Sequence, residues 1–176
     1  MSRILLALPP GTRRAIWRHL LPGPHAEEET AFVYARWTQT DASGTFEFID
    51  WTPVPPLGFL SRSECHLELS DEARSSAIKR AHDLGASLVE FHSHTRSWPA
   101  RFSPSDLAGF GEFVPHVWWR LKGRPYLAVV VSRSGFDGLA WTTGPRTPQR
   151  LTGILDGGEL LRPTGLSSLN EEYHEY

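Results

Sequence analysis

The spacing of apolar positions along the chain predicts an alternation of strands and short helices. Residues 12–21 have the spacing of an amphipathic helix that ends before a cluster of prolines. Residues 30–37 and 45–51 are rich in β-forming side chains and flank turn-forming residues at 41–44, so an antiparallel pair is expected. Residues 64–69 are expected to form a third strand.

The second half of the chain continues this alternation. A helix is predicted within 70–85, because a serine suited to the N-cap precedes alanines at helical spacing and a glycine stands where the helix would stop. Residues 87–92 are predicted to form a strand that runs directly into the sequence His-Ser-His, and another helix is expected to begin at Ser103. The apolar run 126–131 is typical of a buried strand, and 139–141 is expected to be the last strand.

The order of these elements indicates one α/β domain with a mixed β-sheet flanked by helices. A chain of 176 residues is an ordinary size for one domain, and it contains no internal repeat and no long linker. We therefore expect residues 1–176 to form a single domain with its core at about 12–145. The polar stretch 162–176 is expected to form a flexible tail.

Composition and charge narrow the range of partners and locations. The net charge of −2 and the absence of a run of lysines and arginines argue against a nucleic-acid partner. No segment approaches the about 20 apolar residues of a membrane span, and the apolar run within residues 1–10 is interrupted by proline. We expect a cytoplasmic protein with no membrane partner. The single cysteine, Cys65, excludes an intramolecular disulfide and a cysteine-rich zinc site.

The candidate chemistry lies where the predicted strand ends in His-Ser-His. Side chains at i and i+2 leave the same face of a strand, so His92 and His94 can bind one metal ion together. Such a pair alone is weak evidence, but Asp106 follows at the start of a predicted helix, for which Ser103 is the expected N-cap and Pro104 the first residue. Two histidines and one aspartate leave a fourth position for water, as catalytic zinc sites require.

These separated pieces, with a glutamate nearer the N-terminus, resemble the JAMM motif of the JAB/MPN metalloproteases. The resemblance covers roughly residues 28–141 and implies a JAB/MPN-like (cytidine-deaminase-like) fold. It implies that His92, His94 and Asp106 hold one zinc ion (Zn2+), that Ser103 stabilises the tetrahedral intermediate, and that a glutamate acts as general base. Glu90 shares a strand face with the first histidine and is a candidate for orienting a metal ligand.

Three consecutive glutamates could supply the base. Glu28 fits the family pattern best because small residues follow it at the expected positions, although Glu29 remains an alternative. Glu27 and whichever of the other two is not the base are expected to be solvated charges. The chain departs from the family at Thr95, where proline is frequent, and in a slightly longer loop at 95–102.

The resemblance implies an isopeptidase or peptidase that cleaves after the C-terminus of a ubiquitin-like protein. Compact JAB domains of this kind occur in bacterial operons with relatives of activating and conjugating enzymes (E1-like and E2-like), which suggests processing or deconjugation and a role in antiviral defence. Two alternatives share the fold: a metal-free MPN scaffold, which would be expected to lack a ligand, and a hydrolase that acts on a sulfur-carrier adduct. The chain has no His-Glu-x-x-His helix, and one cysteine cannot complete a nucleobase-deaminase site.

Overall fold

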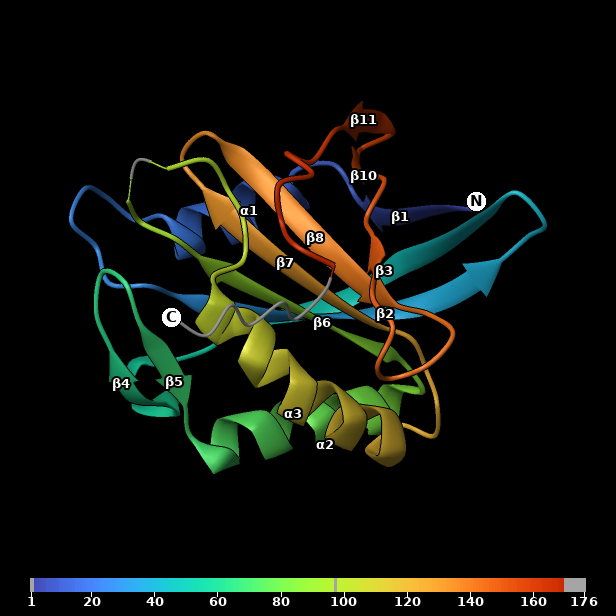
Figure 1. The fold of residues 1–176 in the computed structure, drawn as a ribbon, viewed down its shortest axis with the longest axis horizontal. Coiled ribbons are helices and arrows are strands. Elements are labelled where there is room, and N and C mark those ends of the chain that lie inside the picture. Colours follow the sequence, from blue (N-terminus) through green and yellow to red (C-terminus); the bar gives the residue numbers. More distant parts are fainter. Residues whose placement is uncertain (1, 97, 170–176) are drawn as a thin grey trace, which may run out of the picture.

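The computed structural model describes residues 2–96 and 98–169, and a nine-stranded sheet runs through them (Figure 1). The strand order is β11-β10-β1-β3-β2-β6-β7-β8-β9. Strand β1 is parallel to β10 and β3, and β6 is parallel to β7, whereas the other pairs are antiparallel. The bounds are β1 (Arg3–Leu8), β2 (Thr30–Gln39), β3 (Ser43–Pro53), β6 (Ser87–Ser93), β7 (Tyr126–Ser132), β8 (Gly135–Trp141), β9 (Gln149–Arg150), β10 (Gly153–Asp156) and β11 (Glu159–Leu161).

Three α-helices cover the two faces of this sheet. Figure 1 shows α2 (Asp71–Leu84) and α3 (Pro104–Arg120) together on one side, and α1 (Thr12–Leu20) packs on the other. The buried strand β7 contributes to the apolar core on each face of the sheet, because its alternate side chains point to opposite faces. Tyr126 and Ala128 belong to the core beneath α2 and α3, whereas Leu127 and Val129 belong to the core beneath α1. The expected α/β fold with a mixed sheet between helices is confirmed.

The ends of α2 follow from local residue chemistry. The Ser70 hydroxyl accepts a hydrogen bond from the Ala73 N–H at 3.1 Å, which satisfies one of the free donors in the first turn. Gly85 ends the helix with φ 64°, a left-handed conformation that glycine adopts without steric cost. The helix predicted within 70–85 is therefore confirmed, together with its start signal at Ser70 and its stop signal at Gly85.

Two strand predictions need correction. The expected strand 64–69 is strand only at β5 (Leu67–Leu69), which pairs with β4 (Phe59–Arg62), and the residues between them form the turn. A short 3-10 helix, η1 (Pro56–Gly58), leads into this small hairpin. Strand β8 contains the expected 139–141 but is not the last strand, because β9, β10 and β11 follow it. The antiparallel pairing expected between 30–37 and 45–51 is confirmed by β2 and β3.

The sheet extends beyond the expected core range of 12–145. Strand β1, for which the sequence indicated no element, lies between β3 and β10 and contributes buried leucines to the core. Of the expected tail 162–176, residues 162–169 fold back against the molecule, and residues 170–176 lie outside the described residues. None of the helices in the described ranges is both long enough and apolar enough to cross a membrane.

Candidate metal centre

Strand β6 directs two histidines toward the helix α3 side of the sheet. His92 lies on the same strand face as Leu88, which packs in the core beneath α2 and α3. The next residue on this face is His94, which follows the end of the strand. Its backbone N–H donates to the carbonyl oxygen of Val131 at 2.8 Å, so β7 holds the chain in register past the strand end. Both imidazoles therefore face the start of α3.

Helix α3 begins with the capping arrangement that the sequence predicted. Ser103 is the N-cap and Pro104 the first helical residue. The Ser103 hydroxyl accepts from the Asp106 N–H at 3.1 Å, and Asp106 Oδ2 accepts from the Ser103 N–H at 2.7 Å. This reciprocal pair fixes the carboxylate in the first turn of the helix. The cap thus holds the Asp106 carboxylate on the side of the helix start that faces His92 and His94.

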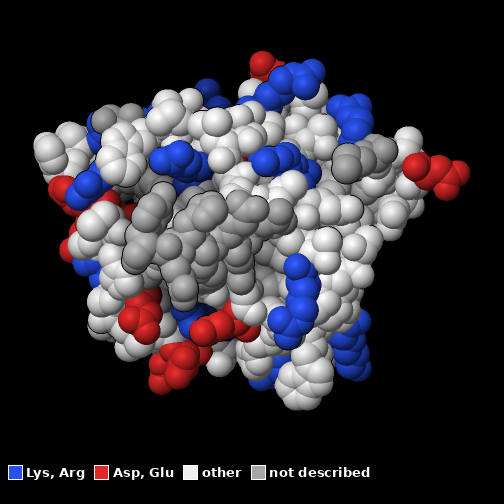
Figure 2. Space-filling view, in the orientation of Figure 1, with Lys and Arg blue, Asp and Glu red and all other residues white. Residues whose placement is uncertain are grey.

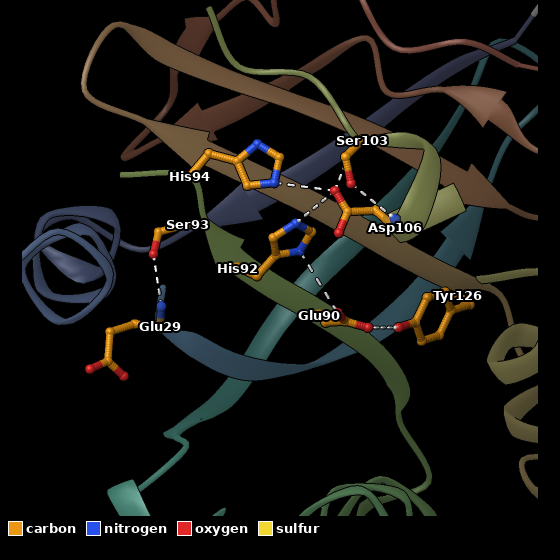
Figure 3. Close-up of polar contacts among 8 residues, drawn as sticks. All are labelled: Glu29, Glu90, His92, Ser93, His94, Ser103, Asp106 and Tyr126. Carbon is orange, nitrogen blue, oxygen red and sulfur yellow. Dashed lines mark hydrogen bonds and ion pairs between the residues drawn. The ribbon is translucent and has the colours of Figure 1, made fainter. Parts of the chain in front are cut away.

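The three side chains converge on one point (Figure 3). One potential ligand atom from each of His92, His94 and Asp106 lies within 4.8 Å of those from the other two. His94 Nε2 is 3.2 Å from Asp106 Oδ2, and His92 Nε2 is 3.4 Å from the same oxygen. Donor atoms at these separations can bind a single ion, which for zinc requires distances near 2.0–2.2 Å to nitrogen and oxygen.

The electrostatics of the cluster reflect its burial. Burial alone would lower the pKa of His92, but the Asp106 carboxylate, with Glu90 and Glu28, raises that pKa to about 9. Burial by itself raises the pKa of Asp106, and the two histidines and the Ser103 N–H outweigh it and hold the pKa far below its usual range. A metal ion would take the place of the proton that these residues otherwise share.

One nitrogen in the cluster indicates that the residues fit a metal. The His92 side chain is only 3% exposed, and its Nε2 has no hydrogen-bond partner among the described residues. The contact of that atom with Asp106 is close enough for an ion pair but lacks the angles of a hydrogen bond. A buried nitrogen without a well-formed hydrogen bond is costly, and metal coordination would satisfy it. The cluster therefore fits a divalent cation with nitrogen and oxygen ligands.

Glu90 and Tyr126 form a buried polar pair behind the first histidine. Glu90 Oε1 is 3.8 Å from His92 Nδ1, and Glu90 Oε2 accepts a hydrogen bond from the Tyr126 hydroxyl (Figure 3). Burial and the neighbouring carboxylate raise the pKa of Tyr126, so the phenol remains a donor. A carboxylate behind a histidine can set the orientation of its ring. The strand pattern indicated Glu90 as a residue that could orient a metal ligand, but no sequence signal indicated that Tyr126 would bind Glu90.

The backbone pairing of β2 with β6 determines which glutamate faces the cluster. Thr30 lies opposite His92, and directly opposed residues share a face of an antiparallel pair. One residue before Thr30, Glu29 pairs with Ser93: the Glu29 N–H donates to Ser93 Oγ at 2.9 Å, and the Ser93 N–H donates to the Glu29 carbonyl at 3.0 Å. Continuing this alternation places Glu28 on the face of the two histidines.

The other two glutamates have a different partner. Arg62 on β4 forms ion pairs with both Glu27 and Glu29, and Figure 3 shows the Glu29 carboxylate directed away from the cluster. The expectation of a solvated charge therefore needs correction at Glu29, whose side chain is only 18% exposed. Arg62 lies more than thirty residues further along the chain, in a strand the sequence did not predict, so this pairing had no local signal.

Glu28 is buried, although no hydrogen bond to its carboxylate is seen within the described part of the chain. Its pKa is raised chiefly by burial, with a further increase from Asp106, and His92 and His94 offset part of this. A buried carboxylate with a raised pKa is a stronger base than an exposed one, which suits a proton acceptor. Glu28 also lines the same cleft as His94, Ser103 and Asp106.

That cleft has a volume of about 460 Å³ and lies between two walls. The turn between β4 and β5 forms one wall, and the loop before α3 forms the other together with residues 166 and 168. Thr95, where the JAMM pattern often has proline, joins the two walls, because its hydroxyl donates to the carbonyl of Glu64 at 3.2 Å. The sequence did not indicate that a segment beyond residue 162 would line the site.

Comparisons with known proteins add no further information about this site. No protein-family model matches the chain, and no curated protein matches it significantly. Any statement of function therefore depends on the residues and their geometry.

Proposed function

We propose that this chain is a zinc-dependent hydrolase of the JAB/MPN kind, with His92, His94 and Asp106 as the metal ligands. The observation that carries the proposal is the meeting of two features in one cleft: a three-ligand group and a buried carboxylate, Glu28, beside it. Three protein ligands are typical of catalytic zinc sites, whereas structural sites usually have four. A divalent metal bound there would act as a Lewis acid, lowering the pKa of water and polarising a carbonyl group.

Glu28 is proposed as the general base. It lies on the histidine face of the sheet but is not a member of the three-ligand group, so its carboxylate is free to exchange a proton. Its raised pKa makes it a stronger proton acceptor toward water than an exposed carboxylate, and the proton it gains can then pass to the departing amine. Glu27 and Glu29 are less suitable because both are engaged with Arg62.

Ser103 is proposed to stabilise the negative charge that develops on the substrate carbonyl oxygen. Its Oγ already accepts the Asp106 N–H, so the oxygen is fixed in position. The hydroxyl hydrogen has no acceptor among the residues the structure describes, and it is therefore available to a substrate in the cleft. A fixed donor of this kind is most effective when the charge forms in the transition state.

The proposed substrate is an isopeptide or peptide bond after the C-terminus of a ubiquitin-like protein. The resemblance to the JAMM motif supports this choice, and the cleft is open at the surface beside the three-ligand group. Relatives of activating and conjugating enzymes would then be its pathway partners. A metal-free scaffold is less favoured because a complete three-ligand group is present. A sulfur-carrier adduct would require the same site residues.

The test is hydrolysis of a ubiquitin-like fusion by the zinc-loaded protein and two variants. Glu28→Gln should retain zinc and lose about 10²–10⁴-fold in kcat, because a general base contributes this much. The matched control is Glu27→Gln, since the Glu27 side chain is 54% exposed and its ion pair among the described residues is with Arg62. Equal kcat values for Glu28→Gln and the wild type would rule out the assigned base. No cleavage of any ubiquitin-like fusion by the wild type would refute the proposed substrate.

A further inference from the structure

Two large apolar side chains stand exposed at the mouth of the cleft. Trp98 is 62% exposed and Leu166 is 54% exposed, although they are 68 positions apart in the chain. Both line the cleft, and both also line an adjoining hollow of about 320 Å³ with Pro99 and Arg101. Single exposed apolar residues are common on protein surfaces, but a group that borders a cleft is typical of a binding surface.

Leu166 is held in place although its side chain is exposed. Asp137 on β8 is only 1% exposed, and its carboxylate accepts from the N–H groups of the residues on either side of Leu166. The Gly165 N–H donates to Asp137 Oδ1 at 3.2 Å, and the Ser167 N–H donates to Asp137 Oδ2 at 2.8 Å. Hydrogen bonds to a buried carboxylate are among the stronger ones in proteins. The backbone of this segment is therefore fixed.

The same segment is tied to the loop that carries Trp98. Ser167 is also only 1% exposed, and its hydroxyl accepts from the Phe102 N–H at 3.0 Å. The Thr164 hydroxyl donates to the carbonyl oxygen of Ala100 at 2.6 Å. These bonds join the segment around Leu166 to the loop just before Ser103. The two apolar side chains thus project from one cross-linked unit, and such preorganisation lowers the entropy cost of binding.

The charge around this pair is positive. The Arg96 guanidinium lies 5.8 Å from the centre of the Trp98 ring, and Arg101 lines both the cleft and the adjoining hollow. Both arginines are exposed, and no ion pair of either is seen within the described ranges. The opposite wall carries Glu64, and Figure 2 shows acidic side chains gathered near β4 and β5 and basic ones above and to the right.

We propose that Trp98 and Leu166 form a subsite for a large apolar side chain that stands next to a carboxylate in the bound substrate. The apolar pair contacts the side chain, and Arg96 and Arg101 attract the carboxylate. Tryptophan and arginine are the residue types that contribute most often to binding energy at interfaces. This inference rests on the proposed function for the identity of the bound chain, and the subsite would set which substrates the cleft accepts.

The first test measures hydrolysis of a ubiquitin-like fusion by Leu166→Ser and Trp98→Ala. Each should raise KM by about 5-fold or more while kcat and zinc content stay at the wild-type level, because the side chains contact substrate away from the metal. The matched controls are Leu60→Ser and Trp119→Ala, since Leu60 and Trp119 are 66% and 75% exposed and do not line the cleft. In an active protein, unchanged KM in both cleft variants overturns the proposal.

A second test does not depend on activity. The fluorescent probe 8-anilinonaphthalene-1-sulfonate combines an apolar ring system with an anion, which is the chemistry that the subsite should bind. Titration with the folded protein should give a dissociation constant that rises about 5-fold or more in Leu166→Ser and Trp98→Ala but not in the two controls. If the wild type cleaves nothing, this pattern still supports the subsite while the proposed function fails. In an inactive protein, equal affinity in cleft and control variants overturns the subsite.

Discussion

Metal binding should raise the melting temperature of this protein by an amount that can be worked out beforehand. A ligand that binds only the folded state stabilises it by RT ln(1 + [L]/Kd), which is about 4 kcal/mol when the free metal is about 1,000 times Kd. For a chain of 176 residues, each kcal/mol corresponds to roughly 2–4 °C. Saturating zinc should therefore raise the melting temperature of the metal-free protein by about 8–16 °C.

The variant that tests this value is His94→Ala. The His94 side chain is 23% exposed, whereas that of His92 is 3% exposed. Truncation of His94 therefore leaves little cavity in the core. Without one of three ligands, most of the zinc-dependent shift should disappear. The matched control is His66→Ala, because His66 is exposed and lines the same cleft but lies outside the three-ligand group.

The assay is thermal unfolding with a chelator and with zinc, together with elemental analysis of each purified protein. Wild type and His66→Ala should each hold about one zinc and show the full shift, and His94→Ala should hold almost none. An equal zinc-dependent shift in the wild type and His94→Ala would refute the assignment of the metal ligands. It would show that any zinc effect comes from elsewhere on the protein.

Three further variants separate structural from catalytic roles. Ser103→Gly should cost only a few tenths of a kcal/mol in stability as an N-cap but about 10²–10³-fold in kcat, and full activity in a zinc-loaded variant would leave the serine as a cap alone. Tyr126→Phe should lower the free energy of unfolding in urea by about 1–3 kcal/mol, because it leaves the buried Glu90 carboxylate without its donor. Glu29→Gln should weaken the pairing with Arg62 and lower stability by up to about 1 kcal/mol while the hydrolysis rate stays unchanged.

Features that depend on neighbouring residues were predictable from the sequence. The caps at Ser70 and Ser103 satisfy backbone donors within the same helical turn, so a few consecutive letters contain the whole signal. The left-handed end of α2 at Gly85 is similar. Strand β6 could also be predicted, because a continuous run of β-forming residues determines both its extent and the shared face of His92 and His94.

Strand β1 and the short strands near the two edges of the sheet were not predictable by such reasoning. Strand β1 is stabilised by pairing with β10, where Leu5 lies opposite Gly153, so the two partners are about 150 positions apart. Strands β9, β10 and β11 contain only two to four residues each, which is too short for a periodic pattern. Their conformation depends on the neighbouring strand that supplies hydrogen bonds, and no local stretch contains that information.

Which of the three consecutive glutamates faces the histidines was only partly predictable from the sequence. Alternation along a strand groups Glu27 with Glu29 and separates both from Glu28. It does not say which group faces the histidines. That depends on the register of β2 against β6, in which Thr30 is opposite His92. The register is a tertiary feature, and a slip by one residue would have exchanged the two groups. The family pattern indicated Glu28, and the register provides an independent physical reason for the same choice.

Asp106 explains why the candidate metal centre was easier to predict than the sheet around it. Its Oδ2 accepts the Ser103 N–H and also lies within 3.4 Å of Nε2 in both His92 and His94. The same carboxylate therefore completes the helix cap and the ligand group. Because the cap signal is local, it locates the third member of the candidate group without knowledge of the fold. The sequence does not determine where the helix start lies relative to β6. That position is set by the packing of α3 on the Leu88 face of the sheet.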